Sequence, residues 1–158
     1  MRDTVRPASL KEKPLIKNLL QPYLHELSEY GNIKPNRLGE YEYRYLDCYW
    51  KEKGRYPYLI FHGRKVAGFV LVRKAGDCYH MAEFFILRPY RRSGLGRWAA
   101  SQVSRKHKGK WRIEFFNANI PAEKFWKIVA SDNADDEVKQ RKSGKTRIYL
   151  EFWTKDAG

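Results

Sequence analysis

The chain has 158 residues, 42% of them hydrophobic, which suits one folded domain over residues 1–158 and excludes a disordered chain. Thirty-two Lys and Arg residues against 18 Asp and Glu give a formal net charge of +14, which favours anionic partners such as phosphates or nucleic acid. No apolar run reaches the roughly 20 residues that span a bilayer, so we expect no membrane partner.

The N-terminal residues predict a short strand followed by a helix. The strand occupies residues 3–7, and the sequence SLKE after it is typical of a capping box in which Ser9 begins the helix and Glu12 bonds back to it. Apolar residues then recur at helical spacing as far as Leu27. Pro22 falls inside this pattern and removes a helix hydrogen bond, so we expect a kink or break just before it.

A tyrosine-rich segment follows a loop at residues 30–39. Residues 40–52 predict a second, short helix. Tyrosine offers apolar area with a polar tip, which suits a surface that covers a ligand, although ordinary half-buried packing explains the same composition. Between residues 41 and 58 the tyrosines are Tyr41, Tyr43, Tyr45, Tyr49, Tyr56 and Tyr58.

The rest of the chain predicts an antiparallel meander and then alternating helices and strands. Apolar runs bounded by turns that contain Gly63 and Gly76 indicate three successive strands. Residues 131–145 are polar and mixed in charge, so they predict a loop or a weak edge strand. The expected strands are 57–62, 66–72, 79–87, 111–116 and 146–153, and the expected helices are 94–108 and 120–130.

The junction between the third of these strands and the next helix reads LRPYRRSGLGR over residues 87–97. The first turn of a helix leaves backbone N–H groups unpaired and carries a partial positive charge. Glycines let a ligand approach those groups closely, and neighbouring arginines add charge and forked hydrogen bonding. The junction therefore predicts a binding site for a phosphate or pyrophosphate.

Two common phosphate motifs fit this junction poorly. A P-loop needs GxxxxGK[ST], which the junction lacks. The run from Gly94 to Ala99 matches the dinucleotide pattern GxGxxA, and Glu114 follows Gly94 by 20 residues. That motif places the strand directly before the first glycine, whereas RPYRRS intervenes here, and no second nucleotide-binding half follows.

Three segments together resemble the GNAT superfamily of N-acetyltransferases. RRSGLG at residues 91–96 matches the pattern [RQ]-x-x-G-x-[GA] that follows the fourth strand of that family. HGRKVAGFVLV resembles the family's second hairpin, and NIPAEKFW at residues 119–126 resembles its N-x-x-A-x-x-F-[YW] helix. The three segments occur in the family's order, and the resemblance covers about residues 3–153.

This resemblance implies an α/β (α+β) fold, a mixed central sheet of six or seven strands with about four helices, splayed between the fourth and fifth strands. It also implies acetyl-CoA as co-substrate and no metal. The turn would hold the pyrophosphate, the fourth strand would pair with the pantetheine, and the later helix would line the opposite wall. The implied residues are Arg91, Arg92, Ser93, Gly94, Leu95, Gly96 and Arg97 for the first role, Phe85, Ile86 and Leu87 for the second, and Asn119, Phe125 and Trp126 for the third.

The same resemblance implies direct attack of a primary amine on the bound thioester, which needs a base. Glu83 is the one carboxylate in the predicted fourth strand, so it is the first candidate for base and amine anchor; pairing with an Arg or Lys is the alternative. His80 is the second candidate for the base. Tyr23, Glu26 and the tyrosines of residues 41–58 are candidates for the acceptor pocket. Many relatives carry a tyrosine where this chain has Trp126, so the general acid is left unassigned.

Two other functions remain open at this point. A basic nucleic-acid-binding module is the first alternative, favoured by the charge and by RKHKGK at residues 105–110, although we do not expect nucleic acid to be the partner. A GNAT-like CoA-binding domain with little turnover is favoured by Trp126. The expected acceptor is a small molecule or peptide amine, and the resemblance also allows a homodimer. Cys48 and Cys78 form no paired motif and the N-terminal residues lack a signal peptide, so we expect a cytoplasmic setting.

Overall fold

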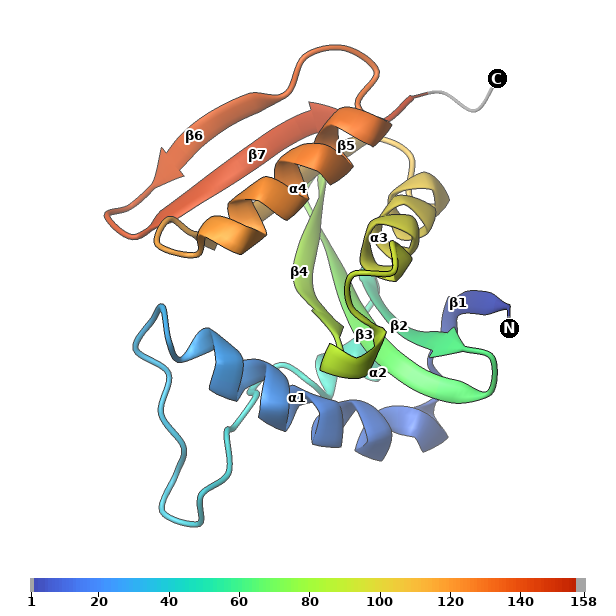
Figure 1. Ribbon diagram of the computed structural model, residues 1–158, viewed down its shortest axis with the longest axis vertical. Coiled ribbons are helices and arrows are strands. Elements are labelled where there is room, and N and C mark those ends of the chain that lie inside the picture. Colours follow the sequence, from blue (N-terminus) through green and yellow to red (C-terminus); the bar gives the residue numbers. More distant parts are fainter. Residues whose placement is uncertain (1, 156–158) are drawn as a thin grey trace.

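The computed structural model describes residues 2–155, which form a seven-stranded mixed sheet in the order β1-β2-β3-β4-β5-β7-β6 (Figure 1). The predicted fold class is confirmed. The strands are β1 (Asp3–Pro7), β2 (Arg55–His62), β3 (Lys65–Ala75), β4 (Cys78–Ile86), β5 (Lys110–Phe116), β6 (Lys139–Ser143) and β7 (Arg147–Trp153). The helices are α1 (Lys13–Leu27), α2 (Cys48–Lys51), α3 (Leu95–Lys106) and α4 (Ile120–Asn133), with 3₁₀ turns η1 (Leu10–Glu12) and η2 (Arg88–Tyr90).

The sheet is covered on both faces, and β3 shows why. Alternate side chains of a strand point to opposite faces. Phe69 and Leu71 of β3 belong to the apolar cluster that includes α1 residues such as Ile16. Val70 and Val72 belong to the other cluster, which includes residues of α3 and α4. The β3 run therefore reads as continuously apolar because both of its faces are buried.

The first helix begins as predicted but is not broken at its proline. The Glu12 carboxylate accepts a hydrogen bond from the backbone N–H of Ser9 at 2.9 Å, so the capping box is confirmed. The α1 helix then continues through Pro22 to Leu27, so the expected break does not occur. The proline removes one hydrogen bond, whereas Leu20 and Leu24 on either side of it are buried against the sheet and hold the helix together.

The tyrosine-rich segment differs more from the prediction. The expected helix over residues 40–52 is reduced to Cys48–Lys51. The residues before it are held by a side chain instead: Gln21 donates to the carbonyl of Tyr41 at 2.7 Å and accepts from the Tyr41 N–H at 2.8 Å. This long-range pair satisfies backbone groups that a helix would otherwise pair locally, so the segment lies as a loop against α1.

The C-terminal third follows the prediction with one extension. The last helix runs three residues further than expected, to Asn133, whose buried amide donates to the carbonyl of Val129 at 2.8 Å. Residues 139–143 form an edge strand, β6, which is one of the two alternatives predicted for this segment. Among the described residues, no helix has the length and apolar character needed to cross a membrane.

The sheet opens between β4 and β5, which sets the position of the site. These two parallel strands pair only from Cys78–His80 to Lys110–Arg112. Beyond this point β4 continues to Ile86 and is paired with β3 alone. The predicted splay between the fourth and fifth strands is therefore confirmed, and one edge of β4 is left open.

The close approach of β3 to β4 makes Gly68 sensitive to substitution. A Cβ at this position would collide with the carbonyl oxygen of Phe85 in the neighbouring strand. We expect Gly68→Ala to lower the free energy of unfolding by about 1–3 kcal/mol, because the two backbones must separate to admit a methyl group. Urea or thermal unfolding measures this change, and an unaltered free energy of unfolding would contradict the close packing.

Candidate functional site

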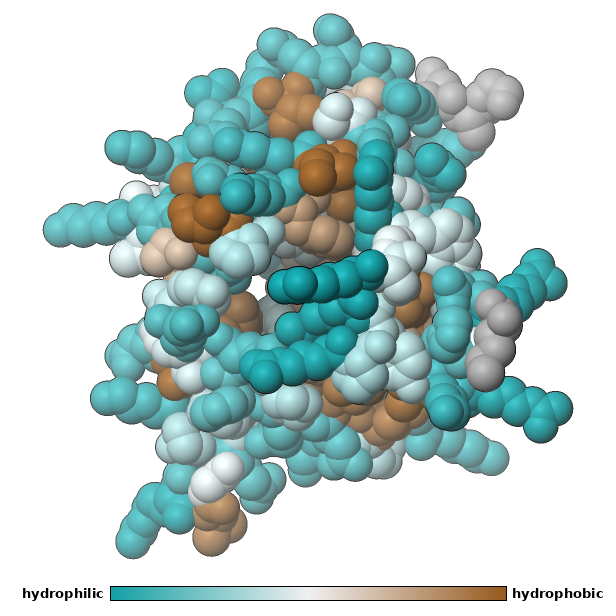
Figure 2. All heavy atoms as spheres, in the orientation of Figure 1, coloured by the Kyte–Doolittle hydropathy of each residue, from teal (hydrophilic) through white to brown (hydrophobic). Residues whose placement is uncertain are grey.

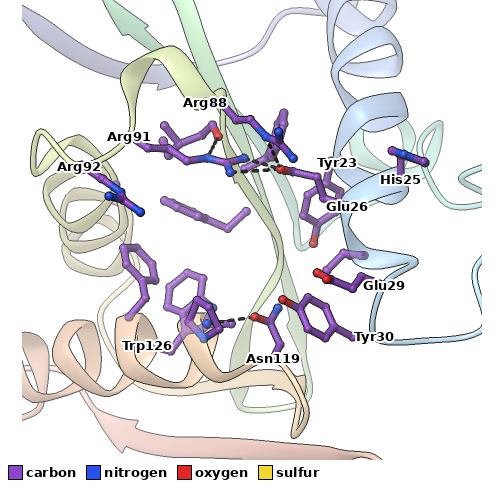
Figure 3. Close-up of a pocket in the computed structure, with 18 of the residues that line it drawn as sticks. Tyr23, His25, Glu26, Glu29, Tyr30, Arg88, Arg91, Arg92, Asn119 and Trp126 are labelled. Carbon is purple, nitrogen blue, oxygen red and sulfur yellow. Dashed lines mark hydrogen bonds and ion pairs between the residues drawn. The ribbon is translucent and has the colours of Figure 1, made fainter.

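A large cleft of about 940 Å³ lies beside the open edge of β4. Figure 2 shows it as a hollow near the centre of this face, with strongly hydrophilic side chains along one rim. One wall is the C-terminal half of α1, and the other is formed by the turn before α3 and the first turns of α3 and α4 (Figure 3). Residues that line the cleft include Tyr23, Glu26, Tyr30, Phe84, Phe85, Ile86, Arg88, Arg91, Arg92, Gly94, Gly96, Arg97, Asn119, Ala122, Phe125 and Trp126.

Backbone geometry at the turn presents N–H groups to this cleft. Gly94 and, more unusually, Arg92 adopt left-handed conformations, with φ of 84° and 63°. A non-glycine residue pays a strain energy there, and such residues gather at ligand-binding sites. The first helical hydrogen bond of α3 runs from Trp98 N–H to the Gly94 carbonyl at 3.0 Å. The N–H groups of residues 95–97 thus precede the helical ladder and can bind an anion.

The arginines in and around the turn differ in whether a carboxylate of the chain pairs with them. Arg97 is held by Asp132, with Nε 2.6 Å from a carboxylate oxygen. Arg91 and Arg88 both bond to Glu26 across the mouth of the cleft, at 2.7 and 3.0 Å. Arg92 has no ion pair with any residue of the described chain, and Figure 3 shows it pointing into the cleft. Arg92 is therefore the arginine most available to a bound anion.

These contacts change the role expected for two residues. Glu26 lies in the wall of the large cleft, where hydrogen bonds from Arg91 lower the pKa of its carboxyl group. It anchors two arginines there and does not line the smaller cavity that contains Glu83. Arg91 also donates to the Ile86 carbonyl at 2.7 Å, so it joins the end of β4 to α1.

The end of β4 offers fewer free groups than the sequence suggested. Both main-chain groups of Leu87 are used within the chain: its N–H donates to the Ala67 carbonyl at 2.8 Å and its carbonyl accepts from Tyr90. Leu87 is thus already paired within the chain, and it does not line the cleft. Phe84, Phe85 and Ile86 line the cleft, and Phe84 is an addition to the residues that the sequence indicated.

Aromatic side chains form the wall opposite α1. The rings of Phe84 and Phe125 lie 5.6 Å apart, and Trp126 stands edge-on to Phe84 at 5.1 Å. Asn119 caps α4 by accepting from the Ala122 N–H at 3.2 Å, and its side chain faces Tyr30 across the cleft in Figure 3. The predicted wall residues Asn119, Phe125 and Trp126 are thereby brought together with the turn.

Two members of the predicted turn, Ser93 and Leu95, do not line the cleft. The side chain of Leu95 is buried in the core with 3% of its surface exposed. The Ser93 hydroxyl donates to the Tyr90 carbonyl at 3.0 Å, which shapes the turn. Gly96 faces the cleft, where a Cβ would lie 3.2 Å from a ring carbon of Phe125.

A second, smaller cavity of about 320 Å³ adjoins the large cleft at the splay and contains Glu83. The residues that line both cavities are Tyr23, Leu27, Phe84, Asn119, Ala122 and Trp126. The cleft and the smaller cavity, which we call the acceptor cavity, therefore meet where β4 leaves β5. The lining of the acceptor cavity comprises Tyr23, Leu24, Leu27, Ile33, Met81, Ala82, Glu83, Phe84, Glu114, Phe115, Phe116, Asn119, Ala122, Trp126 and Arg147.

Glu83 is held by two tyrosines. Tyr23 of α1 donates to one carboxylate oxygen and Tyr43 of the loop donates to the other, each at 2.9 Å. Burial raises the pKa of Glu83, while the two hydrogen bonds act in the opposite direction. The alternative of an ion pair with an arginine or lysine is not what the structure shows. A buried carboxyl group with a raised pKa and a fixed orientation is suited to accept a proton.

The other predicted base lies elsewhere. His80 is at the end of β4 that pairs with β5, beside Arg112, and lines neither cavity. Burial and then the charges of Arg73 and Arg112 lower its pKa. The structure therefore does not bring His80 together with Glu83 in the site.

Sequence reasoning missed two charged members of this region, and it named Tyr43 only as one of six candidate tyrosines. Tyr43 bonds to Glu83, although none of the six tyrosines between residues 41 and 58 lies in the lining of either cavity. Glu114 of β5 and Arg147 of β7 line the acceptor cavity, with their charged atoms 3.7 Å apart. Alternate residues of a strand point to opposite faces of the sheet, so Glu114 faces away from its neighbours Ile113 and Phe115, which belong to the core. A carboxylate between two such apolar residues is the sequence signal that could have identified it.

The arrangement joins three chemical elements in one groove. Free N–H groups and an arginine at the turn suit a pyrophosphate, and the open edge of β4 suits an extended chain with amides. Glu83 then lies further along β4 at the start of the acceptor cavity. In the described part of the chain, no three His, Cys, Asp or Glu side chains cluster as metal ligands.

Comparison with known proteins agrees with this geometry. Residues 18–129 match the model of the acetyltransferase (GNAT) family. An acetyltransferase from Thermus thermophilus superposes with a TM-score of 0.71 at 17% identity, covering 96% of both chains. Spermidine N-acetyltransferase from Vibrio cholerae, in complex with CoA and spermine, gives a TM-score of 0.67 at 12% identity over 96% of this chain and 95% of that one. None of the curated protein sequences matches significantly.

Proposed function

Because this chain belongs to the GNAT family of acetyltransferases, whose co-substrate is acetyl-CoA, we propose that it acetylates a primary amine by direct attack on the thioester. The observation that carries this proposal is the course of β4. One open strand edge leads from the N–H groups of the turn to Glu83, so a single extended ligand can reach from the pyrophosphate site to the base.

The residues of the cleft match the successive parts of acetyl-CoA in their chemistry and in the order in which they lie along the cleft. The backbone N–H groups of residues 95–97 and the side chain of Arg92 would hold the pyrophosphate. The open edge of β4 at Phe84 and Ile86 would pair with the pantetheine, and Phe125 would cover it from α4. The thioester would then lie at the junction of the two cavities, near Tyr23 and Trp126.

Glu83 would accept the proton that the acceptor ammonium must lose before it attacks. The nitrogen lone pair then forms a bond to the thioester carbon, and the carbonyl oxygen takes up the displaced electron pair. A backbone N–H of the open β4 edge would stabilise this oxyanion. The attacking nitrogen loses its second proton to solvent, and collapse of the intermediate breaks the carbon–sulfur bond, so the products are a neutral N-acetyl amine and the CoA thiolate.

Trp126 restricts how the thiolate is protonated. Its indole N–H is a hydrogen-bond donor without acidic character, so this position supplies no general acid. The side chain is buried, with 8% of its surface exposed, and packs on Phe84 and Phe125. Its role is therefore to shape the junction of the two cavities.

A ligand panel in thermal unfolding tests the proposal. Acetyl-CoA at about 100 times its dissociation constant should stabilise the fold by roughly 2.7 kcal/mol, or very roughly 5–10 °C at this chain length. NAD, ATP and a short oligonucleotide are measured separately, at the same salt concentration, as comparison ligands. Equal shifts with every polyanion would instead indicate a general basic surface, and a shift with acetyl-CoA without transfer to any amine would indicate a binding domain.

Tyr43 gives a test of the base through pH dependence. Its hydrogen bond stabilises the ionised form of Glu83, so Tyr43→Phe should raise the pKa of that carboxyl group further. Only the ionised form accepts a proton. The acid limb of the kcat/KM profile should therefore move to higher pH, while the affinity for CoA stays unchanged because Tyr43 lines neither cavity. Tyr45→Phe is the matched control, since its exposed ring has no bond to Glu83.

A further inference from the structure

The proposed reaction requires the thioester and the amine to meet where the two cavities join. Of the six residues that line both cavities, Tyr23 alone carries a side-chain proton that is acidic enough to be transferred. The others are apolar or, like Asn119 and Trp126, have N–H groups that only donate hydrogen bonds. In the described part of the chain, this junction therefore offers one candidate for the general acid that Trp126 does not supply.

Tyr23 is held in place by its ring and reaches the junction with its hydroxyl group. Figure 3 shows it on the α1 wall, across the cleft from Trp126. The ring lies edge-on to Phe69, with centroids 5.5 Å apart, and is tilted against Phe85 at 5.6 Å. The hydroxyl group donates to a carboxylate oxygen of Glu83 at 2.9 Å. Because the ring is packed on two sides, the hydroxyl hydrogen is the part that turns most easily, toward Glu83 or into the cavities.

Other histidine and tyrosine side chains of the region stand apart from the junction. His25 and Tyr30 line the cleft but not the acceptor cavity. Tyr43 also bonds to Glu83, at the same distance of 2.9 Å, yet it lines neither cavity. A proton from Tyr43 thus reaches Glu83 alone, whereas Tyr23 borders the space where both reactants meet.

We propose that Tyr23 is the general acid of the transfer: it gives its proton to the departing CoA thiolate and is reprotonated by Glu83. The inference rests on the proposed function and names a catalytic residue for a step that the proposed function leaves without one. Glu83 and Tyr23 then form a relay that carries one proton from the attacking amine to the leaving sulfur.

Protonation of Glu83 is what makes Tyr23 a donor to the sulfur. Burial, and then the negative charge of Glu83, raise the pKa of Tyr23, so it keeps its proton while the carboxylate is ionised. Once Glu83 has taken a proton from the amine, that charge is gone and the carboxyl group becomes a donor itself. The hydrogen bond between the two groups then reverses, and the hydroxyl hydrogen of Tyr23 turns toward the sulfur.

Protons and electrons balance over this cycle. The acceptor ammonium loses one proton to Glu83 and a second to solvent, and its nitrogen lone pair forms the bond to the acetyl carbon. The electron pair of the carbon–sulfur bond leaves with the sulfur, which takes the proton of Tyr23 as Tyr23 takes that of Glu83. The products are an N-acetyl amine and the CoA thiol, and both side chains return to their starting states.

Titration of the thiol of bound CoA tests the contact with Tyr23 without any acceptor. Ultraviolet difference spectra between the complexes with CoA and with desulfo-CoA, recorded as the pH rises, follow the formation of the thiolate. Tyr23→Phe removes a hydrogen bond to the thiolate, so the pKa of the bound thiol should rise by about one unit or more. Tyr43→Phe is the matched control, since it removes the equivalent bond to Glu83 from outside the cavities, and its change should stay below about half a unit.

The pH profile of kcat separates a proton donor from a residue that only orients Glu83. Both variants lose one hydrogen bond to the carboxylate, so both should move the acid limb to higher pH. On the plateau above that limb, Tyr23→Phe should be slower than Tyr43→Phe by about tenfold or more, because it alone lacks the acid. Rates are measured with the fastest acceptor among phenethylamine, spermidine and a short peptide with an N-terminal alanine.

The outcomes separate this inference from the proposed function. Normal CoA binding with the same thiol pKa in the unaltered protein and in Tyr23→Phe, or equal plateau rates in the two variants, would overturn the role of Tyr23 alone. Loss of CoA affinity in Tyr23→Phe would make Tyr23 a part of the cofactor site and not the acid. Absence of CoA binding to the unaltered protein and of transfer to every amine would overturn the acetyltransferase function itself.

Discussion

Replacing Gly96 by valine is expected to weaken acetyl-CoA binding by about 100-fold or more, equivalent to roughly 2.7 kcal/mol. A Cβ on Gly96 would lie 3.2 Å from a ring carbon of Phe125 and 3.5 Å from Ile86. The two further methyl groups of valine would fill the groove between α3 and α4. A ligand could then no longer approach the free N–H groups of the first turn of α3.

The measurement is a calorimetric titration with acetyl-CoA, together with the unfolding temperature of the free protein. Gln102→Val is a suitable control because it places the same residue on the same helix outside the cleft. The control should retain the affinity of the unaltered protein. Acetyl-CoA affinity that survives in Gly96→Val would place the pyrophosphate away from this turn.

The second large effect is expected at Glu83. Glu83→Gln keeps the shape of the side chain but removes its ability to take a proton, so kcat should fall by about 10²–10⁴-fold. Acetyl-CoA affinity should stay within about twofold, because Glu83 lines the acceptor cavity and not the cleft. Steady-state rates with a primary amine acceptor, combined with titration of acetyl-CoA, separate the two effects.

His80→Ala distinguishes the two bases that the sequence offered. His80 lies beside Arg112 and outside both cavities, so its loss should change kcat by less than about threefold. The double variant Glu83→Gln/His80→Ala should then resemble Glu83→Gln. A severe loss in His80→Ala with normal turnover in Glu83→Gln would reverse the assignment of the base.

The local structure of this chain follows from short sequence patterns. The capping box at Ser9 and Glu12, the continuously apolar run of β3 and the arginine- and glycine-rich turn depend on residues close together in the chain. Helix capping, strand burial and left-handed turns are decided by such neighbours. Glu83 was identifiable for a similar reason, since a carboxylate inside an apolar strand is costly unless it is used or paired.

The partners of these residues were decided by tertiary structure alone. Tyr43 reaches Glu83 across 40 positions of sequence, and Arg91 reaches Glu26 across 65. Nothing in the local pattern at Tyr43 distinguishes it from its neighbouring tyrosines, and local patterning predicted a helix where the chain forms a loop held by Gln21.

The sequence by itself thus determined the order of the elements, the arginine- and glycine-rich turn and the presence of a buried carboxylate. Only the folded chain decided which side chains surround that carboxylate. The acceptor cavity depends on α1, β4, β5 and β7 meeting at the splay, where Arg147 and Glu114 come within 3.7 Å. Such contacts depend on how elements pack over long sequence separations, and no pattern of nearest neighbours specifies that packing.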